Sequence, residues 1–307
     1  MIDPKIHNLI RDLKEDNESG ANELVSNAIE IINAQLELIE EPDRNIEELI
    51  HKLSKEIIQT RSSMAPLINL IGFLISNIPT ITKKQIGKRL KKYLEIREQK
   101  QKELEQVFIS FLRGQKKKPL KIMLISYSST IINILNKIKD LDLEFFVLES
   151  RPLLEGHRTA KLLSQRFPTN LIIDAAMSDF IEQSDLVLIG ADSVLKDGSI
   201  INKVGTKTLT FLAKSRGIKV YVVGDSFKYN LRSHFCNDLV IERKPPEEIY
   251  KVKEEKRNLK IHNYYFDITP TNYVKGIISE FGVLIMHDFL KNVKKEIPIE
   301  WFKRYMD

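Results

Sequence analysis

The spacing of apolar residues changes part-way along the chain. Up to about Gly114 they recur every three or four residues, as between Ile46 and Ile58, which is the pattern of helices with one buried face. The segment from Lys83 to Arg113 keeps this spacing among many charged residues, and Gly114 is well placed to end it. The pattern therefore predicts an all-helical domain over residues 1–114 that closes with one long helix.

A different pattern begins after residue 120. Short runs rich in β-branched residues follow one another, each apolar throughout rather than at every second position, over residues 122–126, 143–149, 170–174, 186–190, 220–224 and 238–242. Such runs are typical of strands buried on both faces, and helical stretches such as Val204–Arg216 separate them, which favours parallel connections. We predict an α/β fold class, in which the helical N-terminal domain is followed, over residues 121–307, by a Rossmann-like doubly wound parallel sheet domain.

Composition adds a boundary and removes one class of function. The chain of 307 residues is 42% hydrophobic, enough for a large core, and carries a formal net charge of +6 that is spread along it. Residues 115–120 form a basic, turn-prone run without interleaved aromatic residues. This run is better interpreted as a solvated linker between the domains than as a nucleic-acid surface, so we expect no direct nucleic-acid binding.

Cysteine and histidine usage limits the chemistry further. Cys236 is the single cysteine, which excludes a disulfide framework and fits a reducing compartment, and we expect it to be a buried, inert thiol. The histidines do not cluster at metal-ligand spacing, and neither nucleotide-binding glycine motif is present, so we expect no metal and no cofactor. The charged start lacks a signal-peptide core and no stretch reaches the ~20 apolar residues of a membrane span, so we expect a soluble, cytoplasmic protein.

Polar residues gather in the segments that follow the predicted strands. These segments are residues 126–130, 149–152, 190–206 and 224–230, and they carry Arg151, Asp192, Asn202, Lys203 and Lys228. Parallel sheets bind ligands beyond the carboxyl ends of their strands, and a cation beside the free amides of a helix start is a common way to hold phosphate. A purely structural reading stays open, in which Asn202 caps a helix and Asp192 ends a strand.

Three motifs carry a resemblance to a known family. They are ESRPLLEG at residues 149–156, GADSVLKDGSIINKVGT at 190–206 and GDSFKY at 224–229. The chain resembles the group that joins the alpha, beta and delta regulatory subunits of translation initiation factor 2B with methylthioribose-1-phosphate isomerase and ribose-1,5-bisphosphate isomerase. The resemblance extends to SGA at 19–21, to TRSS at 60–63 and to the ending at 268–284, which is similar to that of the initiation-factor subunits.

The resemblance also locates the residues that would perform catalysis. The isomerases pair a cysteine after the first strand with the aspartate of a G-A-D motif. Asp192 matches that aspartate, but Ser126 occupies the position of the cysteine. It begins the sequence Ser-Tyr-Ser, which is typical of the regulatory subunits. A serine hydroxyl has a far higher pKa than a thiol and is a poor proton shuttle without an adjacent base.

Ligand-binding positions are kept only in part. The isomerases carry R-G-A near the amino terminus and R-P-T further on, where this chain has Ser19 before Gly20 and Ala21, and Arg61 followed by two serines. One phosphate-binding arginine is therefore missing. The resemblance implies a ligand-binding set of Gly20, Ala21, Arg61, Arg151, Asn202 and Lys203.

Two functions follow from these observations. The first is an initiation factor 2B-like regulatory subunit that forms a homodimer or higher oligomer, contacts the alpha subunit of initiation factor 2 in support of guanine nucleotide exchange, and keeps a sugar-phosphate or nucleotide pocket without efficient turnover. The apolar run Val283–Phe289 is a candidate dimer surface, or else intramolecular core. The alternative is an aldose–ketose isomerase of a ribose phosphate that uses Asp192, with Ser126 or a water in place of the thiol.

Overall fold

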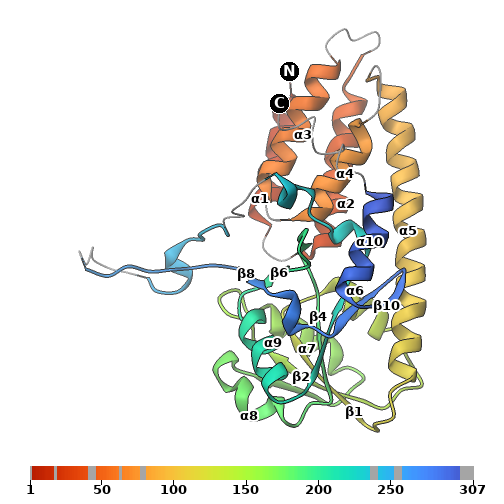
Figure 1. Ribbon diagram of the computed structural model, residues 1–307. Coiled ribbons are helices and arrows are strands. Elements are labelled where there is room, and N and C mark those ends of the chain that lie inside the picture. The colour runs from red at the N-terminus through yellow and green to blue at the C-terminus, as the bar shows by residue number, and fades with distance from the viewer. Residues whose placement is uncertain are drawn as a thin grey trace.

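A computed structural model describes residues 2–16, 19–40, 46–61, 64–76, 81–235, 241–251 and 258–297. The chain begins with a bundle of helices that stands over a sheet (Figure 1). The bundle consists of α1 (Pro4–Glu15), α2 (Ala21–Glu37), α3 (Ile46–Thr60), α4 (Ala65–Ile75) and α5 (Lys83–Arg113). The prediction of an all-helical first part is confirmed. Across the described residues, no helix combines the length and apolar character that a bilayer crossing needs.

Helix α5 joins the bundle to the sheet. Thr82 begins it with a capping box, in which its hydroxyl accepts from the backbone N–H of Gln85 at 3.2 Å, and Gly114 ends it. Its first half packs Leu90 and Tyr93 against the other bundle helices, whereas its second half packs Phe108 against the sheet. The long helix predicted from the apolar spacing is therefore present, and it spans both layers (Figure 1).

The central sheet has seven strands in the order β10-β9-β7-β4-β1-β2-β3. All neighbouring strands of this sheet pair in parallel except at one edge, where β10 (Gly282–Leu284) is antiparallel to β9. The parallel strands are β1 (Leu120–Ile125), β2 (Leu143–Leu148), β3 (Thr169–Ile172), β4 (Leu186–Ile189), β7 (Lys219–Val223) and β9 (Gly276–Ser279). The order reverses between β1 and β4. Ligands of such sheets bind at this switch point, beyond the carboxyl ends of the strands.

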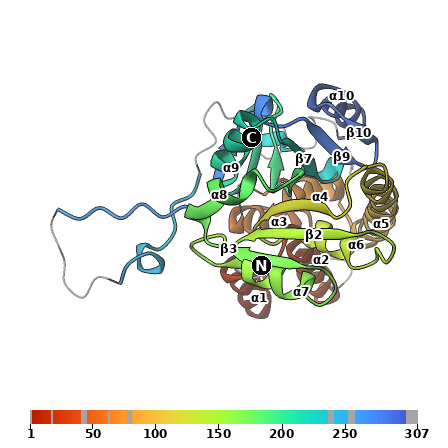
Figure 2. The same cartoon turned by 90° about the horizontal axis from the view of Figure 1, so that it is seen from below.

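Helices cover both faces of the sheet, as a doubly wound fold requires. Ile122 and Leu124 of β1 lie in one hydrophobic cluster with α5, α6 (Ser129–Leu135) and α7 (Glu155–Leu163). Met123 and Ile125 lie in the other with α8 (Met177–Ile181) and α9 (Thr206–Ser215). Figure 2 shows β1, β2 and β3 side by side, with the N-terminal helices behind the sheet. The predicted fold class is confirmed.

Some predicted boundaries and elements differ. The segment 190–206, expected as one loop, contains β5 (Ser193–Val194) and β6 (Ile200–Lys203), which pair with β8 (Phe266–Thr269) in a second, antiparallel sheet. Gly198 permits this hairpin because it turns the chain at a φ of +84°. Of the strand expected over 238–242, residues 238–240 lie outside the described residues and the last two are not in a strand; Cys236 also lies outside them.

The expected linker is partly strand, because Leu120 is buried and begins β1. One hydrophobic cluster runs from Ile2 in the bundle to Ile277 in the sheet, so the division into two domains stays a prediction. In the run Val283–Phe289, the side chain of Val283 is exposed, whereas Phe289 of α10 (Met286–Glu296) is fully buried in that cluster. Part of the run is thus intramolecular core, and its use as a dimer surface stays a prediction.

Candidate functional site

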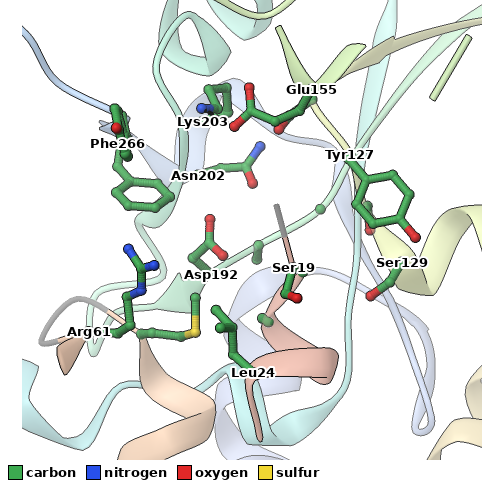
Figure 3. A pocket seen from close by; sticks show the side chains of 18 of the residues that line it. Ser19, Leu24, Arg61, Tyr127, Ser129, Glu155, Asp192, Asn202, Lys203 and Phe266 are labelled. Atoms are coloured by element: carbon green, nitrogen blue, oxygen red, sulfur yellow. Dashed lines mark ion pairs between the residues drawn. The ribbon is translucent and has the colours of Figure 1, made fainter. Parts of the chain in front are cut away.

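A cavity of about 100 Å³ lies at the switch point, between the bundle and the carboxyl ends of β1 and β4 (Figure 3). Its charged lining residues are Asp16, Arg61, Glu155, Asp192, Lys203, Lys228, Glu242 and Lys244. Gly20, Ala21, Ser126, Asn202, Tyr265 and Phe266 also contribute to the wall. The structure therefore brings together every sequence-predicted site residue except Arg151.

Asp192 occupies the middle of the cavity, with its carboxylate facing the open space (Figure 3). Its backbone is fixed by an N–H that donates to the carbonyl of Ile201 at 2.9 Å and by a carbonyl that accepts from Ala65 at 3.3 Å. Among the described residues, no side chain makes a hydrogen bond or ion pair with the carboxylate. Burial raises the pKa of Asp192, and Lys228, Lys203 and Arg61 oppose that rise. The carboxylate is therefore a buried acidic group that faces the cavity.

Lys203 ends β6 and is almost fully buried. Its ammonium group forms an ion pair with Glu155 and lies 5.1 Å from the centre of the Tyr265 ring. Burial raises the pKa of Glu155, and Lys203 opposes that rise. The ion pair closes one side of the cavity, above Asn202 in the view of Figure 3.

Asn202 lines the cavity and also makes a hydrogen bond that stabilises the fold locally. Its side-chain amide donates to the hydroxyl of Thr206 at 3.0 Å, and that hydroxyl donates to the Lys203 carbonyl at 2.6 Å. These bonds hold the turn that leads into α9, as the structural interpretation of the motif expected. Asn202 also lines the cavity, so the two interpretations are compatible.

Two backbone N–H groups at the start of α9 are already bound within the chain. The carboxylate of Asp267 accepts from the backbone N–H of Gly205 at 2.8 Å and from that of Lys207 at 3.1 Å. An acidic side chain thus already occupies the helix start that was predicted to help hold a phosphate. These two N–H groups are therefore not available to a ligand.

Arg61 lies on the opposite side of the cavity from Lys203 (Figure 3). It follows α3, is buried, and donates from its Nη2 to the backbone carbonyl of Asp16. Its Nε is buried without a hydrogen-bond partner among the described residues. Burial lowers the pKa of Arg61, and Asp16 opposes that effect. The Nε–H of the guanidinium group is therefore an unused donor at the cavity wall.

Gly20 and Ala21 form the start of α2, which lies close to Ser129 at the start of α6. A side chain at Gly20 would place its Cβ 3.0 Å from the Ser129 hydroxyl, so the approach depends on glycine. The backbone N–H of Gly20 donates to Glu23 at 2.8 Å. These two residues shape the wall of the cavity and add no charge to it.

Ser126 follows β1 in a left-handed backbone conformation, with a φ of 66°. Its N–H donates to the Ser150 hydroxyl at 2.7 Å, and its carbonyl accepts from Thr159 at 2.8 Å. Within the described part of the chain, no base lies within hydrogen-bonding distance of its side chain. The hydroxyl thus reaches the cavity wall without a group that could accept its proton.

Arg151 is the sequence-predicted residue that the structure places elsewhere. Its side chain is exposed and does not line the cavity, while its backbone N–H donates to Asp174 at 2.7 Å. Strand order alone does not explain this, because Glu155 follows the same strand β2 and lines the cavity. The backbone N–H groups of Ser150 and Arg151 both donate to the carboxylate of Asp174, which follows β3, and these bonds fix the turn with Arg151 exposed. Its role in ligand binding stays a prediction that this geometry does not support.

Several lining residues were not included in the predicted set. Lys228 is 5% exposed, and its ammonium group forms no ion pair within the described residues. Burial lowers the pKa of Lys228, and the negative charges of Asp192 and Asp225 oppose that effect. Lys228 and Glu155 both lie in the family motifs, so the sequence contained a signal for them. Tyr265 and Phe266 come from the start of β8, which no sequence pattern marked as part of a site.

Comparison with known proteins identifies the family. The model of the initiation factor 2 subunit family matches residues 17–285. The chain belongs to this family. A Pyrococcus horikoshii protein named as a translation initiation factor eIF-2B subunit 2-like protein is 30% identical over 290 residues, which cover 93% of this chain and 98% of that protein.

Other members of the family have a different name. The ribose 1,5-bisphosphate isomerase of Archaeoglobus fulgidus is 27% identical over 250 residues, 79% of this chain and 78% of that protein. Among solved structures, translation initiation factor eIF-2B of Pyrococcus horikoshii OT3 superposes with a TM-score of 0.81 at 26% identity, over 94% of this chain and 99% of that one. The family therefore includes both initiation-factor and isomerase names.

Proposed function

We propose that this protein is a regulatory-subunit-like member of the initiation factor 2B group that holds a small phosphorylated ligand in the cavity without converting it efficiently. One observation carries the proposal. Arg61, Lys203 and Lys228 surround the cavity, whereas the position of the family's catalytic thiol holds Ser126, beside which the described residues place no base. The cations support binding, and the unassisted hydroxyl argues against rapid proton transfer.

The proposal includes a protein partner. Relatives over nearly the whole chain are named as initiation factor eIF-2B subunits, so we propose that a cytoplasmic homo-oligomer of this chain contacts the alpha subunit of initiation factor 2 and supports guanine nucleotide exchange. Affinity capture with the purified protein should recover initiation factor 2 from a lysate of the source cells. Recovery of no translation factor would contradict this part of the proposal.

Ligand binding can be tested without presupposing turnover. Ribose 1,5-bisphosphate at about 100 times its Kd should stabilise the folded state by roughly 2.7 kcal/mol, because it binds the native cavity and not the unfolded chain. A melting curve at increasing ligand concentration measures the effect. A melting temperature unchanged by this ligand and by simple nucleotides would contradict a retained pocket.

An isomerase of a ribose phosphate is the second candidate. The specific observation in its favour is Asp192, whose carboxylate faces the cavity with a raised pKa, together with relatives named ribose 1,5-bisphosphate isomerase. Aldose–ketose isomerisation needs a group that moves a proton between adjacent carbons, and such a carboxyl could do so. Turnover of ribose 1,5-bisphosphate that Asp192→Asn abolishes would establish this candidate and displace the first.

A further inference from the structure

The charges that line the cavity balance. Its acidic residues are Asp16, Glu155, Asp192 and Glu242, and its basic residues are Arg61, Lys203, Lys228 and Lys244. A phosphate group brings up to two further negative charges. An incoming phosphate therefore adds negative charge to a formally neutral cavity, and this charge favours protonation of a nearby carboxylate.

Glu155 is the carboxylate best placed to compete with a phosphate. One of its oxygens, Oε1, pairs with the Lys203 ammonium, and the other, Oε2, is buried without a hydrogen-bond partner among the described residues. The Lys203 side chain is 4% exposed and that of Glu155 17%, so water screens this pair weakly. The cation that would hold a phosphate at this side of the cavity is already neutralised by the chain itself.

The surroundings of Glu155 make protonation a feasible response. Besides Lys203, two titratable groups interact electrostatically with Glu155: Asp192, which precedes β5, and Tyr265, which precedes β8. Of the groups that shift the pKa of Glu155, Lys203 is the one cation among the described residues. Burial raises the pKa of Glu155, and an incoming anion would raise it further. Protonating Glu155 would free Lys203 without moving the backbone.

We propose that Glu155 competes with the ligand's phosphate for Lys203, so that binding of a dianionic ligand takes up one proton at Glu155. This inference rests on the proposed function, because it assumes that the cavity binds phosphorylated ligands. Glu155 is thereby a specificity-determining residue, which sets how much negative charge the cavity accepts. Affinity for a dianion increases as the pH falls through the range in which Glu155 gains a proton.

The test uses two probes and a matched control. Ribose 1,5-bisphosphate tests affinity, and sulfate tests the pH dependence, since sulfate stays dianionic between about pH 5 and 8. The variants are Glu155→Gln, which removes the charge and keeps the shape, and Glu144→Gln. Glu144 forms a comparable ion pair with Lys121 at 3.4 Å, outside the cavity, so its replacement makes the same change in net charge.

Glu155→Gln should bind both probes at least tenfold more tightly than the wild-type chain at pH 7.5, and Glu144→Gln should bind them as the wild type does. Calorimetry in two buffers of different ionisation enthalpy should give about one proton fewer taken up by Glu155→Gln on binding sulfate. The wild-type affinity for sulfate should rise as the pH falls, and the rise should be smaller in Glu155→Gln, because only the contribution of Asp192, whose pKa is also raised by burial, then remains.

Two outcomes would overturn the inference, and they differ in what else they affect. In the first, the wild type binds ribose 1,5-bisphosphate, and Glu155→Gln binds it no more tightly and with unchanged proton uptake. Glu155 then does not compete with the phosphate for Lys203, but the proposed ligand binding is still supported. If neither chain binds either probe, both the inference and the proposed ligand binding fail.

Discussion

Gly156→Ala is expected to lower the free energy of unfolding by at least about 3 kcal/mol, the upper end of the range for overpacking. A Cβ atom at this position would lie 1.8 Å from the backbone carbonyl oxygen of Leu148 and 2.9 Å from the carbonyl carbon of Glu149. Both are backbone atoms at the end of β2, which cannot rotate away as a side chain could. Either α7 separates from the sheet, or the protein fails to fold stably.

Gly87→Ala is the matched control for this prediction. Gly87 lies inside α5, and a Cβ there would meet no atom within 4 Å. Because alanine loses less backbone entropy than glycine in a helix, this change should raise stability by about 0.5–1 kcal/mol. Urea denaturation of the two variants measures both effects, and equal stabilities would contradict the close contact between α7 and β2.

Lys203→Met is expected to weaken binding of ribose 1,5-bisphosphate by about 2 kcal/mol or more, roughly thirtyfold in Kd. The change removes a cation that is 3% exposed and leaves Glu155 as an uncompensated acidic group beside the bound phosphate. Calorimetric titration measures the loss. Far-ultraviolet circular dichroism should show an intact fold at the temperature of the titration.

Two further variants separate the role of Lys203 from a general effect of charge. Lys102→Met also removes one lysine, but Lys102 is 63% exposed on α5, forms an ion pair with Glu98 and does not line the cavity, so the Kd should not change. Adding Glu155→Gln to Lys203→Met should recover part of the affinity, because it removes the unpaired carboxyl group. Equal Kd values for wild type and Lys203→Met would exclude Lys203 from the binding site.

The sequence allowed the fold class to be predicted because apolar spacing reflects burial directly. The runs at 122–126 and 186–190 correspond to β1 and β4 within two residues at each end, since both strands are buried on both faces. The sequence analysis did not predict the hairpin of β5 and β6, because its strands are very short and lie in a segment rich in polar and turn-forming residues. Such strands form through pairing with β8, which is distant in the sequence.

The site was predictable where a residue directly follows a strand beside the switch point. Asp192 follows β4 and Ser126 follows β1, and both line the cavity. Arg151 follows β2 and does not line it, although Glu155 from the same connection does, because the side chains that face a cavity depend on the backbone path of the connection and not only on the strand that it follows. The ion pair of Glu155 and Lys203 could not be predicted, since it joins two motifs whose separation in space depends on the completed fold.

Binding and conversion of ribose 1,5-bisphosphate, measured on one preparation of the wild-type protein, test the central claim most directly. Calorimetry gives the binding isotherm, and analysis of the same solution for ketose product gives the turnover. The proposed function predicts saturable binding without efficient conversion, because no base lies beside Ser126 among the described residues. Rapid conversion that Ser126→Ala abolishes would contradict the claim.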